Sequence, residues 1–190
     1  KEILMDGDKV TGILATDPNG NEFKINAKAV IETTGGFGAN SEKVESYRSD
    51  LVGFSTTNHS GALGEGIDMG EKVGAALTDI KEIQIHPTTD PESGYMFTEG
   101  LRGDGAILVN QEGERFTNEL GTRDVVSADI LKQTGGIAYL ITNEEMREDN
   151  GALRGYIEKG YAVEGKDLDL LGQALQVDAE TLKTTLSKYK

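Results

Sequence analysis

Residues 98–110 read TEGLRGDGAILVN, a charged and glycine-rich segment that leads into a short apolar strand. Gly121-Thr122-Arg123-Asp124 follows further along, so that Glu99, Arg102 and Arg123 fall among glycines with few lysines nearby. A guanidinium binds a carboxylate at two points, which a lysine cannot do, and a glutamate between two arginines offers a route for protons. Local reasoning alone favours a plain structural ion pair slightly over a functional site.

The residues after this stretch predict short strands that alternate with helices. The apolar run 106–109, a turn at 111–113 and Arg115-Phe116 indicate a hairpin, and 137–141 indicates a further strand. Helices are expected at four places, each with a capping residue before it: Thr122 to about Leu131, a short helix after Asn143, one after Asp167 and one after Asp178.

The first part of the chain has a different pattern. Residues 9–33 alternate like strands around a turn at Asp17-Pro18-Asn19-Gly20, and Ala29-Val30-Ile31 is typical of a short buried strand. A polar helix is expected after Asn40-Ser41, and a second from Leu63 to Leu77, where apolar residues and glycines recur every three or four positions. The pattern changes near residue 80. We therefore predict an α+β chain in two parts, residues 1–80 and 81–190.

Glycines gather at two places in the first part. Thr33-Thr34-Gly35-Gly36-Phe37-Gly38 ends the predicted strand, and Gly61-Ala62-Leu63-Gly64-Glu65-Gly66 opens the predicted helix. Such positions let backbone N–H groups approach a phosphate or a flavin ring, although tight turns without a ligand explain them equally well. The fingerprint G-x-G-x-x-G is absent in a strand-to-helix context, so the chain by itself does not form a complete dinucleotide site.

Composition excludes several classes of partner. The net charge is -14, which disfavours nucleic acid and anionic membrane surfaces. No cysteine is present, which rules out disulfides, thiolate metal sites and haem attachment within these residues. The two histidines, His59 and His86, do not make a metal site, and the local pattern favours a structural, hydrogen-bonded role for His86. No apolar run reaches the length of about 18 residues that a membrane span needs.

Order and spacing resemble the soluble fumarate reductases of the flavocytochrome c family, within the succinate dehydrogenase/fumarate reductase superfamily. The resemblance covers nearly the whole chain, and it is specific from Thr98 to Asp124. It is carried by these motifs: Thr34-Gly35-Gly36-Phe37, Gly61…Gly64-x-Gly66, Gln84-x-His86-Pro87, Thr98-Glu99-x-x-Arg102-Gly103-x-Gly105-Ala106-Ile107-Leu108-Val109-Asn110, Gly113-x-Arg115-Phe116-x-Asn118-Glu119 and Thr122-Arg123-Asp124.

The resemblance implies a role for each of these segments. Residues 1–80 would be the C-terminal part of an FAD-binding α/β domain, and 81–190 most of an α+β capping domain that closes over substrate. FAD would contact Thr34, Gly35, Gly36, Gly64, Glu65 and Gly66. Glu65 departs from the family, which more often has Asp there, and its side chain is one methylene longer.

In the second part, the resemblance implies that Arg123 donates a proton to the substrate carbon while reduced flavin delivers hydride to its neighbour. Glu99 and Arg102 would return protons to Arg123, and Arg102 is expected to lower the pKa of Arg123 by like charge. The remaining residues would bind or shape the substrate: His86 and Thr98, with backbone near Glu99, would hold one carboxylate, and Gln84 and Met96 would shape the pocket.

The favoured reaction is fumarate to succinate, by an enzyme of which this chain is an internal piece. FAD is expected in the longer protein and not to be retained by this piece alone, which would then be inactive. Another unsaturated acid such as urocanate or an acrylate, an enzyme working in the oxidative direction, and a non-catalytic binding module on the same fold remain alternatives. The electron donor stays open between haem, an FMN domain and reduced nicotinamide, and the sequence leaves the compartment undetermined.

Overall fold

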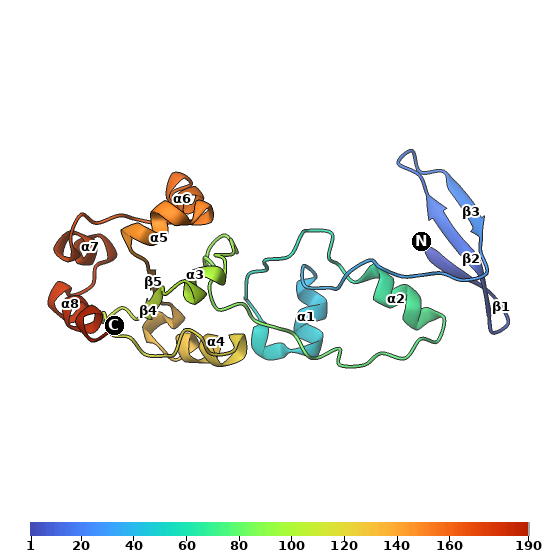
Figure 1. The fold of residues 1–190 in the computed structure, drawn as a ribbon. Helices are drawn as coiled ribbons and strands as arrows, with labels where there is room; N and C mark the ends of the chain where they lie inside the picture. Colours follow the sequence, from blue (N-terminus) through green and yellow to red (C-terminus); the bar gives the residue numbers. More distant parts are fainter. Residues whose placement is uncertain (190) are drawn as a thin grey trace. The chain divides into compact units, whose positions relative to one another are not determined.

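The computed structural model describes residues 1–189 and divides the chain into two compact units, Lys1–Ile83 and the residues from Gln84 onward. Short sheets and helices are mixed along the chain (Figure 1), which confirms the predicted α+β class. Within residues 1–189 no helix is long and apolar enough to cross a membrane.

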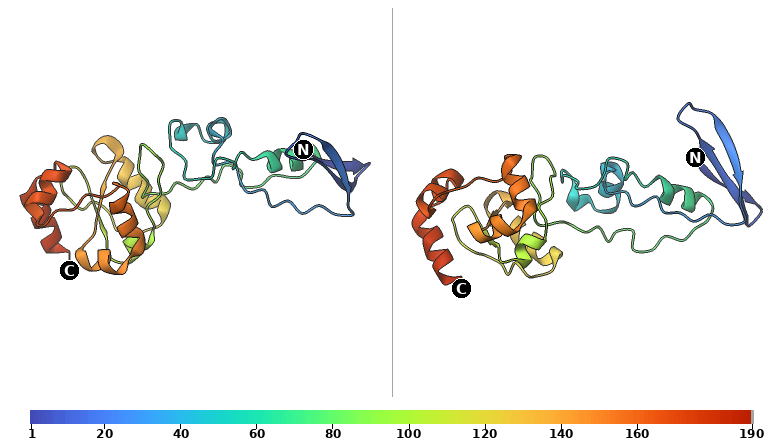
Figure 2. Two further views of the ribbon diagram at one scale, coloured as in Figure 1. Left: turned by 90° about the horizontal axis from the view of Figure 1, so that it is seen from above. Right: turned by 45° about the horizontal axis from the view of Figure 1, so that its top comes forward.

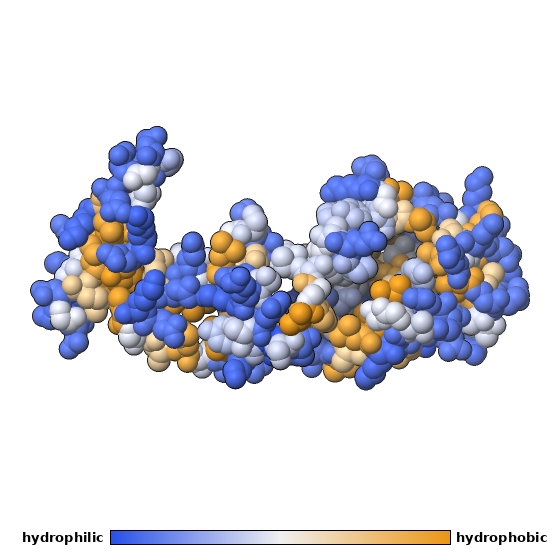
Figure 3. All heavy atoms as spheres, turned by 180° about the vertical axis from the view of Figure 1, so that it is seen from behind, coloured by the Kyte–Doolittle hydropathy of each residue, from blue (hydrophilic) through white to orange (hydrophobic). Residues whose placement is uncertain are grey.

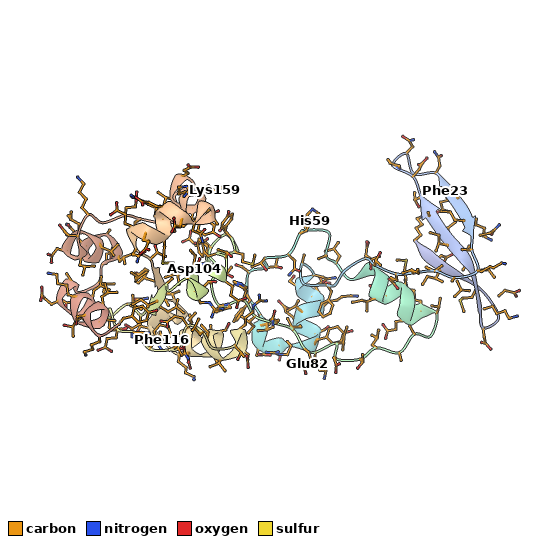
Figure 4. The ribbon with its side chains drawn as sticks, viewed as in Figure 1. Phe23, His59, Glu82, Asp104, Phe116 and Lys159 are labelled. Atoms are coloured by element: carbon orange, nitrogen blue, oxygen red, sulfur yellow. The ribbon has the colours of Figure 1, made fainter. Side chains whose placement is uncertain are left out.

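The first unit begins with a three-stranded antiparallel sheet in the order β1 (Glu2–Asp6), β2 (Lys9–Thr16) and β3 (Glu22–Asn26). The predicted turn joins β2 to β3, with the Gly20 N–H donating to the Asp17 carbonyl at 3.0 Å. Gly12 in β2 has a φ of +150°, and a Cβ there would lie 2.0 Å from the Ile25 carbonyl oxygen, so only glycine fits. Figure 3 shows an apolar patch over this sheet, to which Phe23 (labelled in Figure 4) contributes.

The prediction of a buried strand at residues 29–31 is wrong. These residues have no regular structure, and Ile31 is 87% exposed. A strand exists only when a neighbouring strand takes its backbone hydrogen bonds, and no strand within residues 1–189 pairs with this run. The run is apolar as a buried strand would be, but residues 1–189 contain no strand that hydrogen-bonds to it.

Two helices follow, separated by the 3-10 turn η1 (Ser49–Leu51). α1 (Ser41–Tyr47) begins where expected, because the Asn40 side chain accepts the Lys43 N–H at 3.1 Å. α2 (Glu65–Lys72) is shorter than predicted. Gly74 takes a φ of +88° and its N–H donates to the Glu71 carbonyl, while the Ala75 N–H reaches back to Gly70. This left-handed glycine cap ends the helix before Leu77.

The second unit is built around a short two-stranded sheet, β4 (Ile107–Val109) paired antiparallel with β5 (Tyr139–Ile141). All three β4 residues are buried, and they alternate between two cores. Leu108 packs with Val126 and Ile130 of α4 (Arg123–Leu131), whereas Ile107 and Val109 pack with Leu182 of α8 (Ala179–Lys188). Every apolar side chain of β4 is therefore used, which fixes its register between the helices.

The helices around this sheet follow the predicted caps in three cases out of four. The side chains of Asn143, Asp167 and Asp178 each accept a first-turn N–H, as expected. Thr122 stands at the N-cap of α4, but its hydroxyl donates to Asp124 and makes no capping bond. α7 and α8 lie side by side in the views of Figure 2. The helices are α3 (Gly100–Gly103), α4 (Arg123–Leu131), η2 (Thr134–Gly136), α5 (Glu144–Asp149), α6 (Gly151–Glu158), α7 (Leu168–Leu175) and α8 (Ala179–Lys188).

The predicted hairpin between 106–109 and 115–116 is present but very short. A turn after Asn110 returns the chain to a single antiparallel bridge between Val109 and Arg115, and the longer pairing of β4 is with β5. The hairpin stops after this bridge because the carboxylate of Glu119 accepts the Leu108 N–H at 2.9 Å. A side chain has thus taken the position that a returning strand would need.

Candidate active site

Glu99 lies at the centre of a chain of charged side chains in the second unit. Its Oε2 accepts from Nη2 of Arg123 at 2.6 Å and from Nε at 3.1 Å, and its Oε1 accepts from Nη2 of Arg102 at 2.5 Å. Both arginines hold the pKa of Glu99 below its usual value, Arg123 chiefly through its hydrogen bonds. One carboxylate therefore joins two guanidinium groups, and the three side chains carry a net positive charge.

Arg102 is the buried member of this group, with 3% of its surface exposed. It is presented by α3, the short helix directly before β4, and its Nη1 donates to the Glu119 carbonyl at 2.5 Å. Its Nε and the Ser127 hydroxyl are the two buried side-chain atoms within residues 1–189 that lack a hydrogen-bond partner. Burial holds the Arg102 guanidinium in place against Glu99, as an exposed ion pair would not.

Arg123 is the first residue of α4 and is partly exposed, at 37% of its side chain. Besides Glu99 it contacts Gln84, whose Oε1 accepts from Nη1 at 2.5 Å. The hydrogen bonds that Arg123 donates to Glu99 raise the pKa of Arg123 above its already high value. The net shift is therefore opposite to the lowering expected from Arg102, because the Glu99 carboxylate lies between the two guanidinium groups and accepts hydrogen bonds from both.

His86 lies on a segment that pairs with the residues just before Glu99. Thr89 and Met96 form an antiparallel bridge, and the Phe97 N–H donates to the Thr88 carbonyl at 3.0 Å. Continued by register, this pairing brings His86 level with Glu99. Burial lowers the pKa of His86, Arg123 lowers it further, and its Nδ1 accepts the Thr88 N–H at 3.3 Å. These interactions keep the imidazole neutral and fix Nδ1 as the acceptor, so that Nε2 carries the proton.

Thr98 and Met96 lie on the segment just before Glu99, which pairs with the residues after His86. The Thr98 hydroxyl accepts the Gly100 N–H at 3.3 Å, which joins it to the start of α3. Met96 is 48% exposed and is available for contact with a ligand. All the residues predicted for catalysis and substrate binding thus belong to the second unit, and hydrogen bonds connect Gln84, Arg123, Glu99 and Arg102 directly.

The residues predicted to contact FAD belong to the first unit. Gly64 is the N-cap of α2 with a φ of +78°, Gly35 has a φ of +79°, and a Cβ on Gly35 or Gly36 would meet no other atom. A Cβ on the buried Gly66 would lie 1.9 Å from Thr34 Oγ1. The backbone is therefore open at 35–36 and close-packed at Gly66, beside a helix start whose first N–H groups have no intrahelical acceptor. This arrangement is compatible with the prediction that FAD contacts Thr34, Gly35, Gly36, Gly64, Glu65 and Gly66.

Two residues near the charged group were missed by the sequence analysis as site residues. Glu119 is 3% exposed, and its carboxylate accepts from Leu108 and from Arg115, with Arg115 Nη2 at 2.6 Å. Tyr156, which is 7% exposed, accepts the Thr98 N–H on its hydroxyl at 2.9 Å. Glu119 belongs to a motif that carried the resemblance, so a signal for it existed. Nothing in the sequence connects Tyr156 with Thr98.

The fold and these residues together indicate the class of the protein, a flavoprotein. The chain belongs to the FAD binding domain family, whose model matches residues 1–190. It is 43% identical to an NADH:fumarate oxidoreductase of Klebsiella pneumoniae (strain 342) and 44% identical to a fumarate reductase (cytochrome) of Shewanella frigidimarina. These alignments cover 100% and 99% of the chain, but 20% and 33% of the relatives.

Two further matches extend the comparison. A solved structure, the open conformation of a flavocytochrome c3 fumarate reductase, matches 99% of the chain and 34% of its own with a TM-score of 0.72 at 33% identity. A urocanate reductase of Eggerthella lenta is 35% identical over 95% of the chain and 32% of its own length. The resemblance to the soluble fumarate reductases is thereby confirmed. The chain spans about a third or less of the length of these relatives.

Proposed function

We propose that this chain is part of a FAD-dependent reductase that converts fumarate to succinate, with Arg123 as the proton donor. The observation that carries the proposal is the continuous hydrogen-bonded series Arg102–Glu99–Arg123, which ends at a partly exposed guanidinium. The relatives whose names include fumarate support the choice of substrate. In this proposal Lys1–Ile83 belongs to the FAD-binding domain, and the residues from Gln84 onward belong to the domain that caps the substrate.

Substrate binding follows from the charges of the second unit. A dicarboxylate meets the positive excess of Arg102 and Arg123 over Glu99, and the neutral His86 and the Thr98 hydroxyl donate hydrogen bonds to one carboxylate. Polarising that carboxylate draws electrons from the double bond, which makes the far alkene carbon accept hydride more readily. Gln84 fixes the Arg123 guanidinium from the side opposite Glu99, and Met96 supplies an apolar contact for the carbon chain.

The reaction adds one hydride and one proton across the C=C bond, and FAD, when bound and reduced, supplies the hydride. Arg123 supplies the proton to the neighbouring carbon. The raised pKa of Arg123 means that it is protonated in the resting site. Only a strongly basic carbon can take its proton, which ties proton loss to hydride arrival. The Glu99 carboxylate then takes a proton from Arg102 on one side and gives it to the neutral guanidine of Arg123 on the other, and a proton from solvent restores Arg102.

A reductase of another unsaturated acid is the second candidate, supported by the urocanate reductase that matches 95% of the chain. The residues described above would bind one carboxylate and protonate carbon in either case. The two candidates therefore differ only in what holds the other end of the substrate. A non-catalytic binding module is less well supported, because binding alone needs no relay from Arg102 to Arg123.

Anaerobic titration of the full-length reduced protein tests these candidates. Fumarate should reoxidise the flavin stoichiometrically, whereas oxidation by urocanate and not by fumarate would support the second candidate. Arg123→Lys should abolish most of this reoxidation and leave bound flavin unchanged. Arg147→Lys makes the same change in an exposed pair with Glu144 and Glu164, and serves as the control. Near-normal turnover of Arg123→Lys would overturn the proposal.

A further inference from the structure

Tyr156 connects the helix α6 to the segment that carries Thr98 and Glu99. Its hydroxyl accepts the Thr98 backbone N–H at 2.9 Å, although the two residues are 58 positions apart in the chain. The Thr98 hydroxyl separately accepts the Gly100 N–H. Two hydrogen bonds, one to its backbone and one to its side chain, therefore hold Thr98 at the start of α3. The contact acts directly on the residue that our proposed function places against a substrate carboxylate.

The ring of Tyr156 is held firmly enough to direct its hydroxyl. It is buried with Leu101 of α3 in one core cluster, and the rings of Phe97 and Tyr95 meet it edge to face, with centroids at 5.1 and 5.8 Å. Phe97 and Leu101 lie immediately on either side of the Thr98–Gly100 segment. Tyr156 therefore binds Thr98 through its hydroxyl, meets Phe97 on one flank through its ring, and shares a core cluster with Leu101 on the other flank.

We propose that Tyr156 is a positioning residue for the active site, acting through the Thr98 backbone on the group that binds the substrate carboxylate. This inference rests on the proposed function. Without the hydroxyl, the Thr98 N–H is unpaired, and the segment can rotate to find another acceptor. The Thr98 side chain then leaves the place where a carboxylate would meet it, whereas Glu99 is still held by its two arginines. Removing the Tyr156 hydroxyl should therefore weaken substrate binding more than it slows the chemical step.

Tyr156→Phe in the full-length flavoprotein tests the inference, since the ring and its packing remain. We expect KM for fumarate to rise about tenfold, with kcat reduced less than about threefold and flavin content unchanged. A purely structural role would lower the unfolding temperature and the yield but leave KM of the folded enzyme unaltered. Tyr161→Phe is the matched control, because Tyr161 belongs to the same aromatic cluster and its hydroxyl has no hydrogen bond to Thr98.

A double-mutant cycle with Thr98→Ala shows whether the effect passes through Thr98. In that background Tyr156→Phe should raise KM less than about twofold further, whereas a full tenfold effect would place its action elsewhere. Hydrogen exchange of the wild-type protein over residues 96–101 gives a test without variants. The Thr98 amide should exchange slowly, and exchange at the rate of a free amide would overturn the inference.

The outcomes separate this inference from the proposed function. An unchanged KM in Tyr156→Phe, with Arg123→Lys inactive, would refute the positioning role and leave the reductase proposal standing. An active Arg123→Lys would refute the proton donor itself. A raised KM in Tyr156→Phe together with an inactive Arg123→Lys would support both.

Discussion

Arg123 and Glu99 form a two-point ion pair, with Arg123 Nη2 2.6 Å from Oε2 and Nε 3.2 Å from Oε1, although 24 positions separate them in the sequence. The same Oε1 also accepts from the buried Arg102. Because one carboxylate serves two cations, its charge is needed to keep both guanidinium groups close to each other. Glu99 is thus both the structural and the electrostatic centre of the site.

Glu99→Gln should therefore impair catalysis in the full-length protein more than it impairs folding. A neutral amide cannot pass a proton between two arginines, and it leaves two like charges facing each other. We expect kcat to fall by a factor of about 10² to 10⁴, the range for loss of a proton-transfer group. Steady-state kinetics with fumarate measure this fall in kcat. Glu144→Gln, which changes an exposed partner of Arg147, should retain normal kcat, and a normal kcat in Glu99→Gln would contradict the relay.

The sequence predicted the charged residues of this candidate site better than it predicted the contacts between distant segments that surround them. The motif that contains Thr98, Glu99 and Arg102 and the helix that begins near Arg123 were both predicted, because residue types and caps are local signals. The pairing of β4 was predicted only in part, since Arg115 bridges to Val109 as expected, but the Glu119 side chain accepts the Leu108 N–H and the longer pairing is with β5. The contact of Tyr156 with Thr98 depends on how α6 packs, and no local pattern encodes that. At 29–31 the local pattern was that of a strand, but no strand within residues 1–189 pairs with it, so the local signal alone predicted wrongly.

The pH dependence of stability should report on His86. Its pKa is lowered first by burial and then by Arg123, so the folded protein binds a proton less readily than the unfolded chain. The resulting stability is fully present above the usual histidine pKa of about 6.5 and is lost progressively as the pH falls from there toward the folded value. His86→Gln, which never titrates, should flatten this part of the curve.

Thermal unfolding between about pH 5 and pH 8 measures the effect. His59→Gln is the matched control, because His59 is exposed in the first unit and bonds only locally to the Gly61 N–H. An identical slope in the wild type and in His86→Gln would show that other groups govern this window.

Glu119 should contribute to stability rather than to chemistry. Burial alone would raise the pKa of its carboxyl, but the hydrogen bonds from Arg115 and from the Leu108 N–H outweigh burial and lower it. Glu119→Ala would leave that buried N–H and one side of Arg115 unpaired, at a cost of about 2–3 kcal/mol. Chemical denaturation measures the loss. Glu112→Ala, an exposed residue bonded only to the Thr134 hydroxyl, should cost less than about 0.5 kcal/mol. Equal costs would contradict the special position of Glu119.

The glycine at position 66 should decide whether the first unit can accept FAD. A Cβ there would lie 2.9 Å from the Thr34 Cβ and 1.9 Å from its Oγ1, and a side chain as short as threonine cannot swing away without moving its backbone. Gly66→Ala should therefore displace Thr34 and the neighbouring Gly35 and Gly36, which we propose as FAD contacts. Flavin absorbance per mole of purified full-length protein should fall by at least about half, the loss that a few-fold weaker site produces near its Kd.

The control for this prediction is Gly155→Ala in α6, where a Cβ would meet no atom within 4 Å. The same change in a helix interior with free space should stabilise the protein by up to about 1 kcal/mol and leave flavin content unchanged. If Gly66→Ala kept a full complement of flavin, the close packing of α2 on Thr34 would serve the fold alone. The FAD contacts would then have to be sought away from residues 34–36.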